Sequence, residues 1–252
     1  MKAGLKLWNI NTDFYFEEAK RLYEEGWFDY IELYIVPNCI ETVNKWKTLK
    51  IPYNIHFPHF AHSVNLAKRE FNESNFNIYQ EVKKFADELN ATNIVIHGGI
   101  DGNIEETARQ LKSFNDKRFL IENKPYKALP NKMNGEFCRG ATIEEIEFVI
   151  KESGSGFCLD IGHAICAANS LKEDPYEYIS KFQKLKPVCY HLSDNFIDSE
   201  FDKHLHFGNG NYDFKKIFSL IDLTNNIAIE TNKNSKTDLN DFIEDVKWLK
   251  NL

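Results

Sequence analysis

The hydrophobic pattern of the chain alternates between two periods. Short runs rich in β-branched and aromatic residues are separated by longer stretches in which apolar residues recur at helical spacing. The short runs predict eight strands, at residues 4–9, 30–35, 53–57, 93–97, 119–122, 156–160, 188–192 and 227–230. This alternation is typical of consecutive β–α units.

The stretches between the strands carry helix signals. Thr12 and Asp13 are capping residue types placed just before a helical pattern. Residues 70–90 have apolar side chains near helical spacing, and Thr142 opens a capping-box pattern. The last helix is predicted at residues 237–249.

Eight strands that are each followed by a helix favour a closed parallel barrel over an open doubly wound sheet. The first strand is not followed by a Gly-rich dinucleotide fingerprint, which agrees with this choice. The length of 252 residues is typical of such a barrel, and no linker or low-complexity segment divides the chain. We therefore expect a single-domain α/β protein, a (β/α)₈ TIM barrel over residues 1–252.

Composition narrows the class of protein. A hydrophobic content of 42% is enough for a large core and excludes a disordered chain. The net charge of −7 gives no global attraction to nucleic acid, although a local basic rim or bound cations can reverse the field at a site. The five cysteines are scattered without a CxxC pair, so we expect small buried side chains rather than disulfides or a thiolate zinc site.

No apolar run approaches the roughly 20 residues that span a bilayer. The first residues lead directly into strand-like sequence without a signal-peptide core. We expect a cytoplasmic protein with no membrane partner.

Side chains that bind metal or move protons follow six successive predicted strands. They are His56, His97, Glu122, Asp160, His191 and Glu230, with His163 three residues beyond Asp160. In a parallel barrel these strand ends converge on the face that carries active sites. Carboxylates brought so close together repel one another unless cations or shared protons neutralise them. Imidazole and carboxylate ligands without thiolate favour zinc, with manganese and iron as alternatives.

The loop after the seventh strand adds an Asp-x-His pair, Asp202 and His204, followed by Gly208 and Gly210. In an extended loop, side chains two residues apart can point to the same side and share an ion. A solvated polar loop is the alternative interpretation of this segment.

From His56 to Glu230 these motifs resemble the xylose isomerase-like barrels, and within them the endonuclease IV branch (AP endonuclease family 2). The Asp202-x-His204 segment carries the resemblance to the endonuclease. This resemblance implies up to three zinc ions. It assigns His56, His97 and Glu122 to the first ion; Glu122, Asp160, His191 and Glu230 to the second; and His163, Asp202 and His204 to the third.

Two activities remain open. The first is phosphoester hydrolysis by a cluster of ions, with Glu122 as a bridging ligand and a phosphorylated substrate such as damaged DNA flipped into the site. The second is single-metal isomerisation or epimerisation of a sugar, in which Glu122 and Glu230 move the proton. Only the first needs the third ion. A metal-dependent binding module is a third, non-enzymatic interpretation.

The loop after the fifth strand is basic. Residues 123–140 contain Lys124, Lys127, Lys132 and Arg139 against one acid. We expect Lys124, Lys127 and Arg139, together with His59, to bind substrate beside the metal site. An ordinary solvated loop is the alternative.

Overall fold

The fold is a closed barrel of parallel strands, seen in a computed structural model that describes residues 2–252; residue 1 of the predicted domain lies outside the described residues. Within these residues the strands pair in chain order, and β1 pairs with β8 to close the barrel. The strands are β1 (Lys2–Trp8), β2 (Tyr30–Tyr34), β3 (Tyr53–His56), β4 (Ile94–His97), β5 (Phe119–Glu122), β6 (Gly156–Asp160), β7 (Cys189–Leu192) and β8 (Asn226–Ile229). The predicted (β/α)₈ fold class is confirmed.

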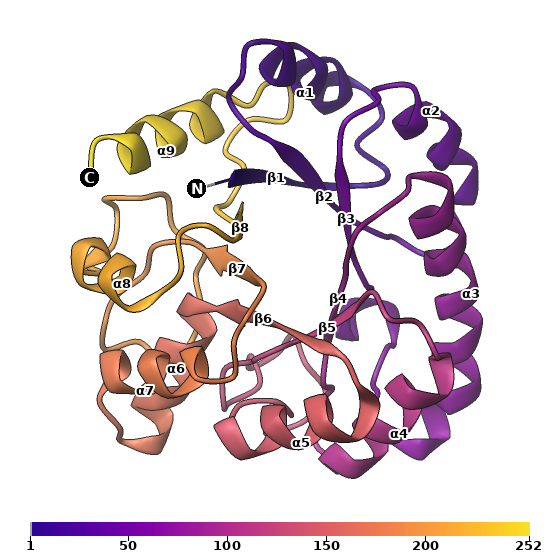
Figure 1. Cartoon of the computed structure of the whole chain (residues 1–252), viewed down its shortest axis with the longest axis vertical. Helices are drawn as coiled ribbons and strands as arrows, with labels where there is room; N and C mark the ends of the chain where they lie inside the picture. Colours follow the sequence, from indigo (N-terminus) through magenta and orange to yellow (C-terminus); the bar gives the residue numbers. More distant parts are fainter. Residues whose placement is uncertain (1) are drawn as a thin grey trace.

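Helices surround the strands in a ring (Figure 1). The α-helices are α1 (Phe14–Glu24), α2 (Val43–Lys47), α3 (Asn72–Glu88), α4 (Ile104–Phe114), α5 (Ile143–Ser153), α6 (Ile161–Leu171), α7 (Pro175–Gln183), α8 (Phe214–Leu220) and α9 (Asn240–Lys250). Short 3₁₀ turns are η1 (Ile40–Thr42), η2 (Phe60–His62) and η3 (Arg69–Phe71). None of the helices in residues 2–252 has both the length and the apolar character needed to cross a membrane.

The predicted elements agree with the structure to within a few residues. β5 and β6 have the predicted bounds, and the stretch at 70–90 divides into η3 and α3. Thr142 caps α5 by accepting a hydrogen bond from the Glu145 amide at 3.3 Å. Asp13 precedes α1 but makes no side-chain cap hydrogen bond, so the capping role implied for it is wrong.

The core lies between the strands and the helices, and a smaller layer fills the barrel. Val95, Leu120, Cys158 and Cys189 form a buried cluster there. All five cysteines are free, and all but Cys39 are buried, as expected for small core residues.

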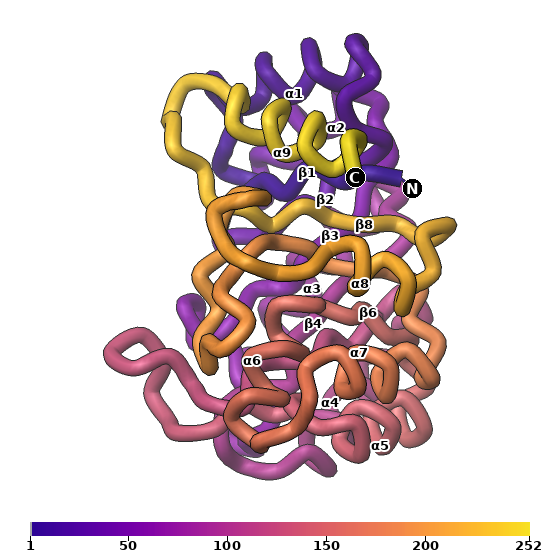
Figure 2. The backbone as a smooth tube through the Cα atoms, turned by 90° about the vertical axis from the view of Figure 1, so that its left-hand side faces the viewer, coloured from indigo at the N-terminus to yellow at the C-terminus, as the bar shows by residue number. Residues whose placement is uncertain are grey.

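All eight strands end on the same face of the barrel. In Figure 2 the first strand starts near the N label at the right, and the loops that follow the strands lie at the left. The register sets His97 beside Glu122, and Asp160 beside His191. The strand order therefore brings together side chains that are far apart in the sequence.

Candidate metal centre

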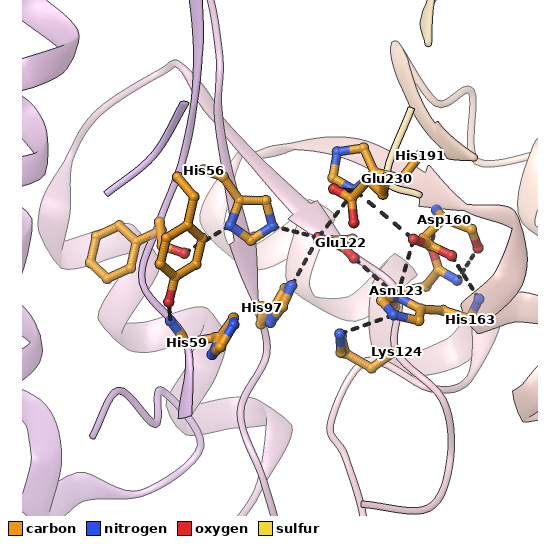
Figure 3. Close-up of polar contacts among 12 residues, drawn as sticks. His56, His59, His97, Glu122, Asn123, Lys124, Asp160, His163, His191 and Glu230 are labelled. Carbon is orange, nitrogen blue, oxygen red and sulfur yellow. Dashed lines mark hydrogen bonds and ion pairs between the residues drawn. The ribbon is translucent and has the colours of Figure 1, made fainter. Parts of the chain in front are cut away.

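Glu122 is the centre of the candidate site (Figure 3). It ends β5 and is 1% exposed. One carboxylate oxygen, Oε2, lies 3.1 Å from His56 Nε2 and 2.9 Å from His97 Nε2. The other, Oε1, lies 3.0 Å from His163 Nδ1. The three residues assigned to the first ion thus offer ligand atoms that all lie within 4.8 Å of one another.

The second set converges on His191, which is fully buried in β7. Its Nδ1 atom lies 2.9 Å from Glu230 Oε1, 3.6 Å from Glu122 Oε2 and 4.0 Å from Asp160 Oδ2. The three carboxylates predicted to share an ion with His191 therefore all lie within 4.0 Å of its Nδ1 atom. Glu230 itself stands one residue beyond β8.

The third set is a separate group within reach of one ion, formed by His163, Asp202 and His204. Asp202 Oδ2 lies 3.6 Å from His163 Nε2 and 3.3 Å from His204 Nε2. His204 has a φ of 49°, a left-handed conformation that is uncommon for a residue other than glycine. Its carbonyl accepts the Asn232 amide at 2.9 Å, which holds the loop against the segment after β8.

The two glycines of this loop have a structural explanation. The Asp194 carboxylate accepts the amides of both Gly208 and Gly210 at 2.9 Å. A Cβ atom on Gly210 would lie 2.2 Å from the Asn195 carbonyl oxygen, so no side chain fits there. The loop that carries Asp202 and His204 is thus folded around a buried carboxylate.

Asp160 has two roles that use different oxygens. β6 runs directly into α6, and Asp160 Oδ1 caps that helix by accepting the His163 amide at 2.6 Å. Oδ2 faces His191. Burial raises the pKa of Asp160 to about 6; His163 opposes the increase, and Asp202 and Glu122 add to it. The positive charge near this carboxyl group is therefore too small to offset its burial and the neighbouring carboxylates.

Divalent cations fit these residues. Glu122 Oε1, His191 Nδ1 and Asp202 Oδ2 are buried and make no hydrogen bond with the described residues. Buried polar atoms are normally paired, and such exceptions need an explanation. All three atoms belong to residues of the predicted ligand sets, and imidazole with carboxylate is a ligand set for zinc, manganese or iron.

The sequence interpretation missed two residues of the cluster, Glu32 and Lys6. Glu32 lies in the middle of β2 and is fully buried. Its carboxylate contacts His191 Nε2 and accepts from Lys6 Nζ at 2.6 Å. Lys6 also donates to Glu230. Both residues lie within a strand rather than at its end, and a charged residue within an otherwise apolar strand is itself a signal.

A cavity of about 1030 Å³ opens above the cluster, and its wall includes His59, Lys124 and Lys127. Lys124 is 7% exposed, and its Nζ lies 3.2 Å from His163 Nε2. Lys127 pairs with Glu200 at 2.7 Å. Arg139 is not brought to the cavity wall: its guanidinium bonds Glu145 at 3.0 Å and the carbonyls of the loop after β4.

The opposite wall was not predicted. Lys203, Lys233 and Lys236, from the segments after β7 and β8, also line the cavity. Burial lowers the pKa of Lys233. Burial, together with His56 and Lys124, lowers the pKa of His59 to about 3, so its imidazole is neutral at physiological pH. The walls combine cations with neutral hydrogen-bonding groups.

A parallel barrel with an imidazole–carboxylate cluster at its C-terminal face combines the usual position of a barrel active site with side chains of the types that bind transition metals. The model of one family, the xylose isomerase-like TIM barrel, matches residues 19–252, and the chain belongs to that family.

The proteins that this chain is similar to carry names related to both activities that the sequence suggested. The chain is 29% identical over 163 residues to the probable endonuclease 4 of Thermoplasma volcanium; the match covers 60% of this chain and 57% of that relative, less than two thirds of its length. Endonuclease IV from Thermus thermophilus superposes with a TM-score of 0.72 at 20% identity, covering 100% of both chains. A D-tagatose 3-epimerase-like protein has the same TM-score and identity, covering 100% of this chain and 96% of that one. The predicted resemblance is confirmed, and these two structural likenesses concern the fold.

Proposed function

We propose that the protein is a metal-dependent phosphoester hydrolase of the endonuclease IV type, with a di- or trinuclear zinc site. The observation that carries this proposal is the third ligand group. His163, Asp202 and His204 are gathered beside Glu122, and a single-metal isomerase does not need them. The curated relative named endonuclease 4 supports the same choice.

A cluster of divalent ions activates water near neutral pH and offsets the charge of a phosphate. In this chain Glu122 would help to hold more than one ion, because its two oxygens face histidines of different predicted sets, His97 and His163. His59, which is neutral, can exchange hydrogen bonds with a sugar or phosphate without adding charge. Tyr34, whose pKa burial raises to about 12, keeps its hydroxyl proton.

The cavity walls support an anionic substrate. The wall includes Lys124, Lys132, Lys203, Lys233 and Lys236, in addition to the paired Lys6 and Lys127. Its carboxylates are Glu122, Asp202 and Glu230, all members of the proposed ligand set. With ions bound, the wall would therefore be strongly positive, which favours a phosphorylated substrate.

The third group gives the decisive test. We expect His204→Asn to abolish cleavage of a phosphoester substrate, such as an oligonucleotide with one abasic site, while His62→Asn, whose imidazole lies outside the cavity wall, remains active. The measurement is single-turnover cleavage with zinc, manganese or iron supplied. Sugar epimerisation by the native protein that survives His204→Asn would reverse the proposal.

The sugar isomerase is the second candidate, since Glu122 and Glu230 both flank His191 Nδ1. Salt dependence separates a nucleic acid from a small substrate. Binding of a DNA backbone should weaken steeply with salt, with a slope of log K near −0.9 per phosphate neutralised. A flat dependence would exclude DNA and leave a small phosphorylated or sugar substrate.

A further inference from the structure

Glu32 and Lys6 form a charged pair beneath the cluster that the nine proposed ligands do not include. The two residues are register partners on neighbouring strands, β1 and β2, so their side chains point to the same side of the sheet. Lys6 Nζ lies 2.6 Å from Glu32 Oε1, and both side chains are nearly inaccessible, at 13% and 0% exposed. A buried carboxylate needs such compensation to stay ionised.

Glu32 controls one nitrogen of His191. His191 Nε2 lies 3.0 Å from Glu32 Oε1 and 3.1 Å from Oε2. A ring nitrogen that faces both oxygens of a carboxylate carries a proton and donates it. The other nitrogen, Nδ1, then faces Glu230, Glu122 and Asp160, where an ion would sit. A histidine that binds metal through one nitrogen and a carboxylate through the other has its orientation fixed.

Lys6 controls what Glu32 can do. Glu32, His56, His191 and Glu230 are close enough to form an ion site of their own. The Lys6 ammonium, however, already binds Glu32 Oε1 and Glu230. A fixed positive charge at Glu32 Oε1 repels a metal ion from this carboxylate. Glu230 meets Lys6 through Oε1, and its Oε2 can still take part in binding.

We propose that Glu32 is a positioning residue that fixes His191 with Nδ1 toward the cluster, and that Lys6 keeps Glu32 out of the ligand set. This inference rests on the proposed metal-dependent function. It adds that the affinity of the ion held by His191 depends on a carboxylate that does not bind the ion itself.

Metal titration of the metal-free protein tests the proposal. Zn²⁺ is titrated against a competing chelator, and ions per chain are counted by elemental analysis, for the native protein, Glu32→Gln and Lys6→Met. We expect Glu32→Gln to weaken one ion by about 10- to 100-fold and to leave the other ions unchanged. Lys6→Met should bind that ion as tightly as the native protein, or more tightly, because a repelling charge is gone.

Glu200→Gln is the matched control, since it removes a carboxylate that pairs with a lysine at the cavity rim, at 2.7 Å, without contacting a proposed histidine ligand. If only the loss of one negative charge mattered, Glu32→Gln and Glu200→Gln would weaken ion binding equally. Nitrogen-15 NMR of the zinc-loaded protein adds a readout specific to orientation. In the native protein the proton on His191 Nε2 should give the downfield signal of a strong hydrogen bond. In Glu32→Gln this proton signal should move upfield.

Each remaining outcome has one meaning. If the native protein binds no transition metal, the proposed function fails. If it binds metal and Glu32→Gln matches Glu200→Gln in both readouts, the positioning role is wrong and the function stands. A loss of affinity with the His191 signal unchanged makes Glu32 a ligand, which also overturns the proposal. If Glu32→Gln does not fold, Lys6→Met/Glu32→Leu removes both charges together and should lose the same ion.

Discussion

The two ends of β5 carry charged clusters that are built in opposite ways. At the start of the strand, Arg118 pairs with Asp116 at 2.6 Å and with Asp87 at 2.9 Å. Its Nε and amide also donate to Asp116, so one carboxylate is bound by a guanidinium fork and a backbone group. At the end of the strand, Glu122 stands among histidines and other carboxylates and keeps an oxygen without a hydrogen bond.

This difference separates charges that are paired within the fold from charges that we propose bind metal ions. The Arg118 cluster satisfies its polar groups within the chain. The Glu122 cluster leaves polar atoms unpaired in the interior, which is unfavourable for the metal-free chain. Local departures from good pairing of this kind are expected at functional sites.

The largest expected effect is that of Glu122→Gln. The amide cannot bridge two cations as a carboxylate does, so we expect hydrolysis to fall by roughly 1000-fold or more, about 4 kcal/mol in the activation barrier. The zinc content per chain should also fall. Turnover and elemental analysis measure the two effects. Full activity with unchanged zinc would show that Glu122 is not at the centre of the site.

Removal of metal should have the next largest effect. Ions that bind only the folded chain stabilise it by about 4 kcal/mol when their free concentration is 1000 times Kd. We therefore expect chelation to lower the urea midpoint of unfolding. Chelation should lower the urea midpoint of Asp116→Asn by the same amount as that of the native protein, because Asp116 lies at the other end of β5 from the candidate metal site. Equal midpoints with and without chelator would contradict a metal site here.

Asp116→Asn should have the smallest effect, on stability alone. Removing one partner of this half-buried cluster should cost roughly 1–3 kcal/mol at neutral pH. Burial opposes ionisation of Asp116, but the hydrogen bonds and charge of Arg118 lower its pKa below the usual value. A lowered pKa stabilises the fold above the unfolded pKa of about 3.9, and this stabilisation is lost as pH falls through the folded pKa.

The stability difference between the native protein and Asp116→Asn should accordingly be complete near pH 6 and shrink below about pH 4. Urea unfolding at several pH values measures it, with zinc content as the control that should not change. A difference that grows as the pH falls would show that the Arg118 cluster does not set the pKa of Asp116.

The sequence was most informative where one pattern governed both fold and site. Short apolar runs end at Glu122 and Asp160, so the strand ends and the candidate site residues there were predicted together. Glu32 was not predicted as a site residue because it lies within β2. A single sequence does not say which buried residue will contact it across the barrel.

Arg139 shows what charge along a loop leaves open. Its place in a basic loop predicted a substrate contact, yet its guanidinium binds Glu145 and two backbone carbonyls. Charge along a loop does not specify which side chains turn inward, since that depends on acceptors supplied by other segments. The lysines after β7 and β8 were missed for the same reason.

The contact between Lys6 and Glu230 lies at the seam where the first and last strands meet. Glu230 is the last of the proposed ligands to leave the ribosome during translation, and β8 must dock against β1 before its carboxylate reaches the others. Uptake of the ion that needs Glu230 therefore has to follow closure of the barrel. Occupancy of that one ion would then report whether β8 has docked against β1, and a product truncated before β8 would not bind it.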